Sequence, residues 1–108
     1  MKKQLSKHVL FIHGAGEGGY EGDVALVASL RKALGTNYIV HFPKMLADEL
    51  LYFGEGWPKQ IGEEISFIKD EVILAGHSLG ASMLLKYLSE NKMQNNIAGV
   101  FQIGRAHV

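Results

Sequence analysis

Short runs rich in apolar residues alternate along the chain with longer segments in which apolar residues recur every three or four positions. The short runs cover residues 8–13, 38–42, 72–75 and 97–101 and predict β-strands. The runs at 8–13 and 72–75 are typical of buried strands, the second of them on both faces. The longer segments cover residues 23–34, 58–68 and 79–91 and have the periodicity of helices that bury one face. This order predicts parallel βαβ units with right-handed crossovers.

The apolar positions also predict which face of each helix is buried. The expected buried residues are Leu26, Val27, Leu30 and Leu34 in the first helix, Trp57, Ile61, Ile65 and Ile68 in the second, and Met83, Leu84, Tyr87 and Leu88 in the third. Gly35 suits the C′ position that ends the first helix, and Pro58 suits the first turn of the second. We therefore expect an α/β fold with about four parallel strands and flanking helices, in three α-β-α layers.

The overall composition excludes several classes of protein. The formal net charge is zero, so nothing indicates binding to nucleic acid or to an anionic membrane surface. The chain has no cysteine, and no H-E-x-x-H-like spacing of its histidines and carboxylates predicts a metal site. No run approaches the ~20 apolar residues of a membrane span. We expect a single cytoplasmic domain that needs no cofactor, whose oligomeric state the sequence does not predict.

The run at 72–75 leads directly into Gly76-His77-Ser78-Leu79-Gly80 and then into a predicted helix. G-x-S-x-G between a strand and a helix is typical of the nucleophile elbow of serine hydrolases. The turn is so tight that side chains at Gly76 and Gly80 would clash, which leaves Ser78 exposed at the end of the sheet. The N–H of Leu79 then points at the oxyanion of an attacked carbonyl. The plainer alternative is a glycine-rich turn in which Ser78 only caps the helix.

A second glycine-rich loop, His13-Gly14-Ala15-Gly16, follows the first predicted strand. In a serine hydrolase such a loop supplies a second oxyanion donor, here the N–H of Ala15. The same loop contains Gly14-x-Gly16-x-x-Gly19, which has the spacing of a dinucleotide-binding fingerprint. That alternative also requires an acidic residue at the end of the next strand. This chain has His41-Phe42-Pro43 there instead.

Together, the two motifs and the helix–strand–helix pattern between them resemble the N-terminal part of an α/β-hydrolase, most closely a small bacterial serine hydrolase. The resemblance implies a partial α/β-hydrolase fold in which Ser78 is the nucleophile. It also implies that the N–H groups of Leu79 and Ala15 form the oxyanion hole. The implied activity is esterase-like hydrolysis of a small acyl substrate, whether a carboxylic ester, a thioester or an amide.

Four further residues are candidates for the substrate pocket. Tyr20 follows the glycine-rich loop and Trp57 precedes the second helix, although positions in the core or at its rim would explain both equally well. His13 ends a strand beside the site, and we expect it to shape the loop. We expect His77, inside the elbow, to pack beside its strand rather than to act on Ser78.

A catalytic triad also requires an acid and a histidine base, which in this family follow the serine in the chain. After Ser78 the chain has only Glu90, at the end of a predicted helix, and His107. We therefore expect a truncated and nearly inactive hydrolase whose acid and histidine lie beyond the end of the chain. The second hypothesis is a non-catalytic binding protein of the same fold, which keeps the elbow but not the triad.

The last residues of the chain do not continue the pattern that precedes them. One set of codons for residues 102–108, Gln-Ile-Gly-Arg-Ala-His-Val, is identical to part of a common short-read sequencing adapter. We therefore expect a native domain of residues 1–101 and a non-native tail, so that His107 is not the catalytic base. The last strand would then be an uncovered sheet edge, and we expect marginal stability and aggregation.

Overall fold

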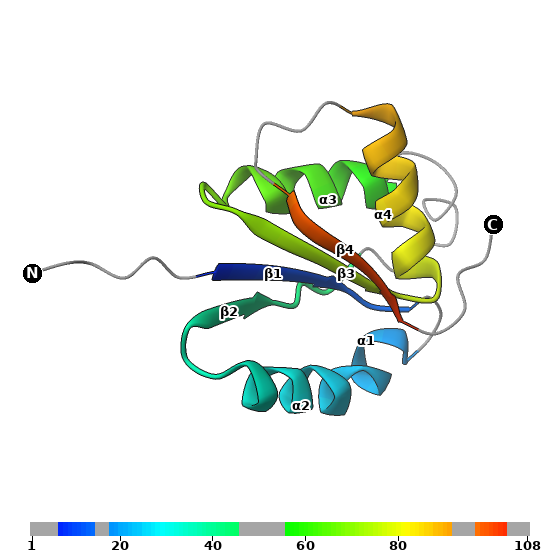
Figure 1. The fold of residues 1–108 in the computed structure, drawn as a ribbon. Coiled ribbons are helices and arrows are strands. Elements are labelled where there is room, and N and C mark those ends of the chain that lie inside the picture. The colour runs from blue at the N-terminus through cyan, green and yellow to red at the C-terminus, as the bar shows by residue number, and fades with distance from the viewer. Residues whose placement is uncertain (1–6, 15–17, 46–55, 92–96, 104–108) are drawn as a thin grey trace, which may run out of the picture.

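The strands form one parallel sheet of four strands in the order β2-β1-β3-β4 (Figure 1). The computed structural model describes residues 7–14, 18–45, 56–91 and 97–103. The strands are β1 (Lys7–Ile12), β2 (Tyr38–His41), β3 (Val72–His77) and β4 (Ile97–Ile103). The helices are α1 (Gly19–Gly22), α2 (Val24–Leu34), α3 (Gly56–Ser66) and α4 (Leu79–Glu90).

Helix α2 covers one face of the sheet, and α3 and α4 cover the other (Figure 1). Side chains along a strand alternate between the two faces. In β1, Val9 and Phe11 therefore belong to the core under α2, whereas Leu10 and Ile12 belong to the core under α3 and α4. The expected fold class is confirmed, because the chain forms a parallel α/β sheet between two helical layers.

The expected buried faces of the helices are correct except at one residue of α2. The expected residues of the second predicted helix are all buried: Trp57, Ile61 and Ile65 in α3 and Ile68 just after it. In α4 the stripe from Met83 to Leu88 packs against the same core. Leu26 of α2 is instead 37% exposed. It lies about 100° around the helix from Val27, and Val27, Leu30 and Leu34 already form the stripe that packs against the sheet.

The remaining differences from the sequence prediction concern the ends of elements. Helix α1 was not expected, because Gly19-Tyr20-Glu21-Gly22 combines two poor helix formers with no apolar period. Strand β3 continues through Gly76 and His77 into the elbow. Strand β4 includes Gln102 and Ile103, the first residues of the expected tail, whereas residues 104–108 lie outside the described part of the chain.

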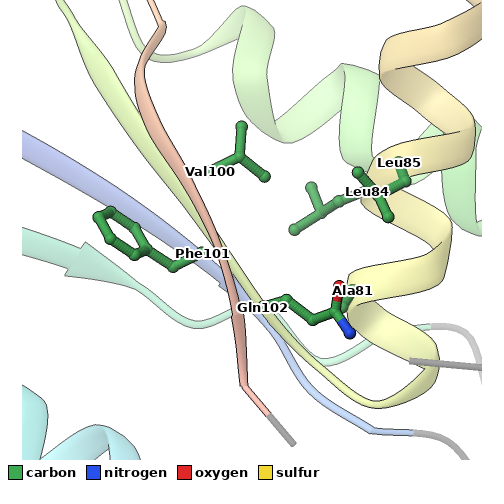
Figure 2. Close-up of a pocket in the computed structure, with 6 residues that line it drawn as sticks. All are labelled: Ala81, Leu84, Leu85, Val100, Phe101 and Gln102. Atoms are coloured by element: carbon green, nitrogen blue, oxygen red, sulfur yellow. The ribbon is translucent and has the colours of Figure 1, made fainter. Parts of the chain in front are cut away.

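Strand β4 forms one edge of the sheet, and within the described residues its outer side pairs with no strand. Two of its large apolar residues are exposed, Val100 by 42% and Phe101 by 58%. A groove of about 210 Å³ runs between β4 and α4 (Figure 2). Its lining residues are Ala81, Leu84, Leu85, Val100, Phe101 and Gln102. The apolar edge is therefore uncovered within the described part of the chain, as the sequence predicts.

Candidate active site

The segments that follow β1 and β3 lie side by side at the carboxyl ends of these adjacent strands. In the register of the sheet, Ile12 at the end of β1 is opposite Gly76 in β3. The chain runs from β1 to β2 in one direction across the sheet and from β3 to β4 in the other, so the strand order reverses here. Open α/β sheets bind ligands at such a reversal, outside the carboxyl ends of the strands. Both glycine-rich motifs of the sequence therefore meet at the expected position for a ligand.

Ser78 has a backbone conformation that side-chain-bearing residues rarely adopt. Its φ is 56° and its ψ is −117°, and it is the one non-glycine residue in the described part of the chain with a positive φ. A conformation of this kind costs on the order of 1–3 kcal/mol and persists only where the surrounding structure enforces it. The turn from β3 into α4 is therefore strained at the serine itself.

The glycines on either side of Ser78 explain how the strain is enforced. A Cβ placed on Gly76 would lie 2.5 Å from the backbone nitrogen of Ala81, and one placed on Gly80 would overlap the carbonyl oxygen of Ile12. Both obstacles are backbone atoms, which cannot move aside as a flexible side chain can. Only glycine therefore fits at either position, as the motif predicts.

Ser78 is bonded to its surroundings through its backbone and not through its hydroxyl. Its N–H donates to the carbonyl oxygen of Ile103 at 3.2 Å, and its own carbonyl oxygen accepts the N–H groups of Ala81 and Ser82. Ser78 occupies the N-cap position of α4, but its hydroxyl makes no capping hydrogen bond. The N–H of Leu79, first in the helix, has no acceptor within the helix and is available to a ligand.

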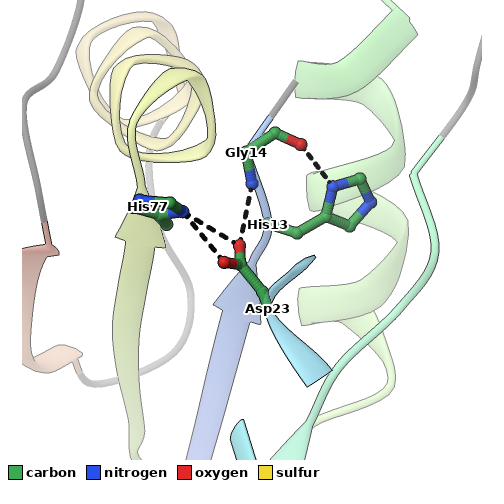
Figure 3. A network of polar contacts seen from close by, with 4 residues as sticks. All are labelled: His13, Gly14, Asp23 and His77. Atoms are coloured by element: carbon green, nitrogen blue, oxygen red, sulfur yellow. Dashed lines mark hydrogen bonds and ion pairs between the residues drawn. The ribbon is translucent and has the colours of Figure 1, made fainter. Parts of the chain in front are cut away.

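Asp23 links the loop after β1 to the elbow after β3 (Figure 3). Its Oδ2 accepts the backbone N–H of Gly14 at 3.1 Å, and its Oδ1 lies 3.0 Å from Nδ1 of His77. The carboxylate is almost fully buried, with 6% of the side chain exposed. Both bonds are charge-assisted, which makes them stronger than bonds between neutral groups. One carboxylate therefore fixes the separation of the two glycine-rich segments.

The hydrogen bonds of His13 fix its tautomer and exclude it as a catalytic base. Its Nε2 accepts the N–H of Met45 at 2.9 Å, so the ring proton is on Nδ1. Nδ1 then donates to the carbonyl oxygen of Gly14 at 2.6 Å (Figure 3). His13 is buried and both of its nitrogens are engaged. It therefore bonds Gly14 at the start of the glycine-rich loop.

A cleft of about 340 Å³ opens beside Ser78. Its lining residues are Gly14, Gly18, Gly19, Gly22, Asp23, His77 and Ser78. Gly14 lies directly against the serine, because a Cβ placed on it would be 3.8 Å from the Cβ of Ser78. The cleft thus brings together a strained serine, a carboxylate–imidazole pair and the backbone of the glycine-rich loop.

The other residues singled out from the sequence lie in different places. Trp57 is 1% exposed and packs in the core in a T-shaped contact with His13, so it offers no surface to a ligand. Tyr20 is half-buried and stacks on Phe42 at a ring separation of 4.3 Å. Ala15 and Gly16 lie outside the described residues. The predicted oxyanion donor of Ala15 therefore stays a prediction.

No histidine of the described part of the chain is hydrogen-bonded to the Ser78 hydroxyl. Glu90 is at the solvent-exposed end of α4 and pairs with Lys86 at 2.8 Å. His107 lies outside the described residues. Among the described residues, Ser78 therefore meets neither a base nor an orienting acid in the arrangement that a triad requires.

A second polar cluster lies on the sheet away from this site. Nδ1 of His8 and Nε2 of His41 are 2.9 Å apart, and Nε2 of His8 lies 3.6 Å from the carboxylate of Asp70. Burial lowers the pKa of His41, and the nearby His8 and Arg31 lower it further. The pair connects β1 to β2, and nothing in its position relates it to Ser78.

Comparisons of the chain with protein-family models, with curated proteins and with solved structures find no match. In the part of the chain that the structure describes, no group of three or more His, Cys, Asp or Glu side chains could hold a metal ion. No helix of that part is long and apolar enough to cross a membrane. The function has to be inferred from the geometry of the site itself.

Sequence reasoning missed Asp23, which organises the site. Asp23 precedes α2 in the position of an N-cap, where an aspartate ordinarily caps the helix with its side chain. Here the side chain makes no capping bond, because its oxygens bond Gly14 and His77. Two features of the sequence could together have suggested this link. One is a carboxylate just after the glycine-rich loop, and the other is a histidine inside the elbow.

Proposed function

We propose that this protein is a serine hydrolase of the α/β-hydrolase type with Ser78 as its nucleophile. The observation that carries the proposal is the positive φ of Ser78 between two glycines whose Cβ atoms would overlap backbone. Strain of this kind at a residue other than glycine is concentrated at active sites. A turn that only connects a strand to a helix does not require it, since glycine at the same position would remove the strain.

In the proposed reaction, Oγ of Ser78 attacks the carbonyl carbon of an ester, a thioester or an amide. Negative charge then develops on the carbonyl oxygen, and the N–H of Leu79 at the positive end of α4 donates to it. The N–H of Ala15 is the second donor that the family resemblance implies. Collapse of the tetrahedral intermediate expels the leaving group, and water hydrolyses the acyl-enzyme. The reaction needs neither a metal nor an organic cofactor.

The proton of Ser78 requires a base, and we assign it to a histidine later in the native reading frame, oriented by an acid. This is the order that the family resemblance implies, and the engaged nitrogens of His13 support it. The natural substrate is a small acyl compound in the cytoplasm. Neither a nucleic acid nor a membrane is proposed as a partner.

Turnover of a short-chain aryl ester tests this function. The protein is expressed from the native reading frame of its source DNA, and the rate is compared with that of Ser78→Ala. We expect the substitution to lower kcat by at least about a thousandfold, because the loss of a triad nucleophile costs this much or more. Equal rates for the two proteins would show that Ser78 is not the nucleophile.

The second candidate is a non-catalytic binding protein that keeps the elbow but no triad. The observation that favours it is that no histidine of the described residues is bonded to the Ser78 hydroxyl. The source DNA beyond the codon for Phe101 distinguishes the two. An aspartate and then a histidine at later strand ends support the enzyme, and a frame without them supports the binding protein.

A dinucleotide-binding function has less support than either. The fingerprint would direct the N–H groups of the glycine-rich loop at a pyrophosphate. The buried carboxylate of Asp23 already accepts the N–H of Gly14, and its negative charge disfavours a phosphate at the same place. Strand β2 ends at His41, without the acidic residue that would bind the ribose.

A further inference from the structure

The bond between His77 and Asp23 determines which nitrogen of His77 is available to a ligand. Nδ1 of His77 lies 3.0 Å from Oδ1 and 3.1 Å from Oδ2 of the carboxylate. An ionised carboxylate only accepts hydrogen bonds, so the ring proton is on Nδ1. In the neutral imidazole, Nε2 then has a free lone pair and is an acceptor. Nε2 has no hydrogen-bond partner among the described residues.

His77 lines the cleft beside Ser78, so a substrate bound there comes within reach of the imidazole. His77 and Ser78 are consecutive residues and line the same cleft. The imidazole is 38% exposed, whereas the carboxylate that holds it is buried. A ligand in the cleft beside Ser78 therefore meets the ring of His77 and not that of His13, which is buried with both nitrogens engaged.

The described lining of the cleft favours some substrate groups over others. Four of its seven lining residues are glycines, so no large apolar side chain of the described residues is there to bind a long alkyl chain. The negative charge of Asp23, which lines the cleft, disfavours an anionic group. A small, uncharged or cationic group with a hydrogen-bond donor suits both conditions.

We propose that His77 is a specificity-determining residue whose Nε2 accepts a hydrogen bond from the substrate. This inference rests on the proposed function and names its substrate class. The substrates are acyl compounds in which a small group with an N–H or O–H donor lies next to the scissile carbonyl. Asp23 is a positioning residue, because it acts through His77 by holding the proton on Nδ1.

A matched pair of boronic acids tests the proposal, because boron binds a serine hydroxyl reversibly in the place of the acyl carbon. The first probe is acetamidomethylboronic acid, which carries an amide N–H. The second is its ketone isostere, in which a methylene replaces that N–H. Each is titrated into isotope-labelled protein expressed from the native reading frame, and Kd is measured from the amide shifts of Gly14 and Leu79. We expect the amide to bind about tenfold more tightly, the value of one good hydrogen bond.

His77→Asn separates the specificity role from a purely structural one. The asparagine side-chain amide reaches the position of Nδ1 and keeps a donor to Asp23, but it has no group at the position of Nε2. We expect this variant to unfold at the same denaturant concentration as the wild type, and to bind the two boronic acids equally. Ser78→Ala is the control for covalent binding, and neither compound should bind to it.

Three results would overturn the inference. If the wild type binds both compounds equally, His77 does not recognise a donor, and Ser78 can still be the nucleophile. If His77→Asn keeps the preference for the amide, another group accepts the N–H. If neither compound binds the wild type, or if Ser78→Ala binds them as well as the wild type does, the proposed function fails and the inference fails with it.

Discussion

Asp23 and Ser78 each depart from what their local sequence favours, and both departures are at the same cleft. Asp23 precedes a helix that it does not cap with its side chain, and Ser78 holds a φ of 56° that glycine would adopt without strain. Each departure has a cost in stability. Two such costs among the lining residues of one cleft are characteristic of a functional site, since a turn under selection for stability alone would avoid them.

The tightness of the elbow predicts a large difference between two otherwise similar substitutions. In Gly80→Ala the new Cβ would overlap the carbonyl oxygen of Ile12, whereas in Gly22→Ala the new Cβ would meet no atom within 4 Å. Both glycines lie in helices, where alanine is intrinsically favoured by up to ~1 kcal/mol. We expect Gly80→Ala to lower the free energy of unfolding by about 3 kcal/mol and Gly22→Ala to leave it unchanged or raise it.

Urea denaturation of the two variants and the wild type measures this difference. The single-methyl change is the same in both, so the intrinsic helix preference of alanine is matched. Equal stabilities of the two variants would contradict the packing of α4 against the end of β1.

At the scale of residues, the sequence predicts those site residues that lie close together in the chain. It does not predict the contacts between residues that are far apart in the chain. Gly76, Ser78 and Gly80 fall within five positions of one another, so a local motif identifies them. Asp23 is nine residues from Gly14 and 54 from His77, its two partners. Only the folded chain brings those groups together. For the same reason, the tautomers of His13 and His77 could not be predicted from the sequence.

At the scale of elements, the pair His8–His41 joins β1 to β2 through side chains as well as through the sheet. Their nitrogens are 2.9 Å apart, a distance at which one proton lies between them. A charged His41 would lose hydration through burial and would also lie close to His8 and to the guanidinium of Arg31. Burial first, and then these neighbours, explain why the pKa of His41 is lowered in the folded protein.

The lowered pKa predicts the sign of a pH effect on stability. As the pH falls below the ordinary histidine value of 6.5, the unfolded chain binds a proton at His41 before the folded chain does. The free energy of unfolding is therefore expected to fall between pH 6.5 and the lower folded pKa, with no contribution from His41 above that range. His41→Gln keeps a polar group near the position of Nε2 but does not titrate.

Urea denaturation at a series of pH values compares the two proteins. We expect the wild type to lose more stability on acidification than His41→Gln does. If stability depends on pH in the same way for the two proteins below pH 6.5, the pKa of His41 is not lowered in the folded protein.

The elements themselves were largely predictable, because their patterns are strong. The four strands and the three longer helices follow from apolar runs and from helical spacing. Helix α1 was not predictable, because two of its four residues are glycines and their neighbours carry no period. The ends of β3 and β4 were also missed, since pairing with a neighbouring strand and not composition extends them into His77 and Ile103.

At the scale of the whole molecule, the two edges of the sheet differ in length and exposure. Strand β2 at one edge has four residues, whereas β4 at the other has seven and carries no charged residue. A long, uncharged and exposed edge strand is a site of strand pairing between molecules. The exposure of Phe101 adds apolar surface to the same edge.

Self-association through β4 is therefore expected, and Phe101→Lys should reduce it. A lysine on an edge strand opposes pairing with another strand, and Phe101 is 58% exposed, so little burial is lost. Phe67→Lys is the matched control, because Phe67 is 81% exposed but lies outside the sheet. Light scattering over a range of protein concentrations measures the average mass.

We expect Phe101→Lys to shift the onset of association to a protein concentration several times higher, and Phe67→Lys to have a much smaller effect. A wild type that stays monomeric and unfolds cooperatively would contradict this expectation. So would equal effects of the two substitutions, since general surface hydrophobicity and not the sheet edge would then drive association.

The most direct test of Ser78 as a nucleophile is its reaction with a fluorophosphonate, followed by intact-mass and peptide mass spectrometry. The protein is expressed from its native reading frame, and the wild type is compared with Ser78→Ala and with wild type unfolded in urea. We predict one phosphonyl adduct, on the peptide that contains Ser78, in the folded wild type only. No adduct on the folded wild type, or equal labelling of Ser78→Ala, would contradict the assignment of a nucleophile elbow.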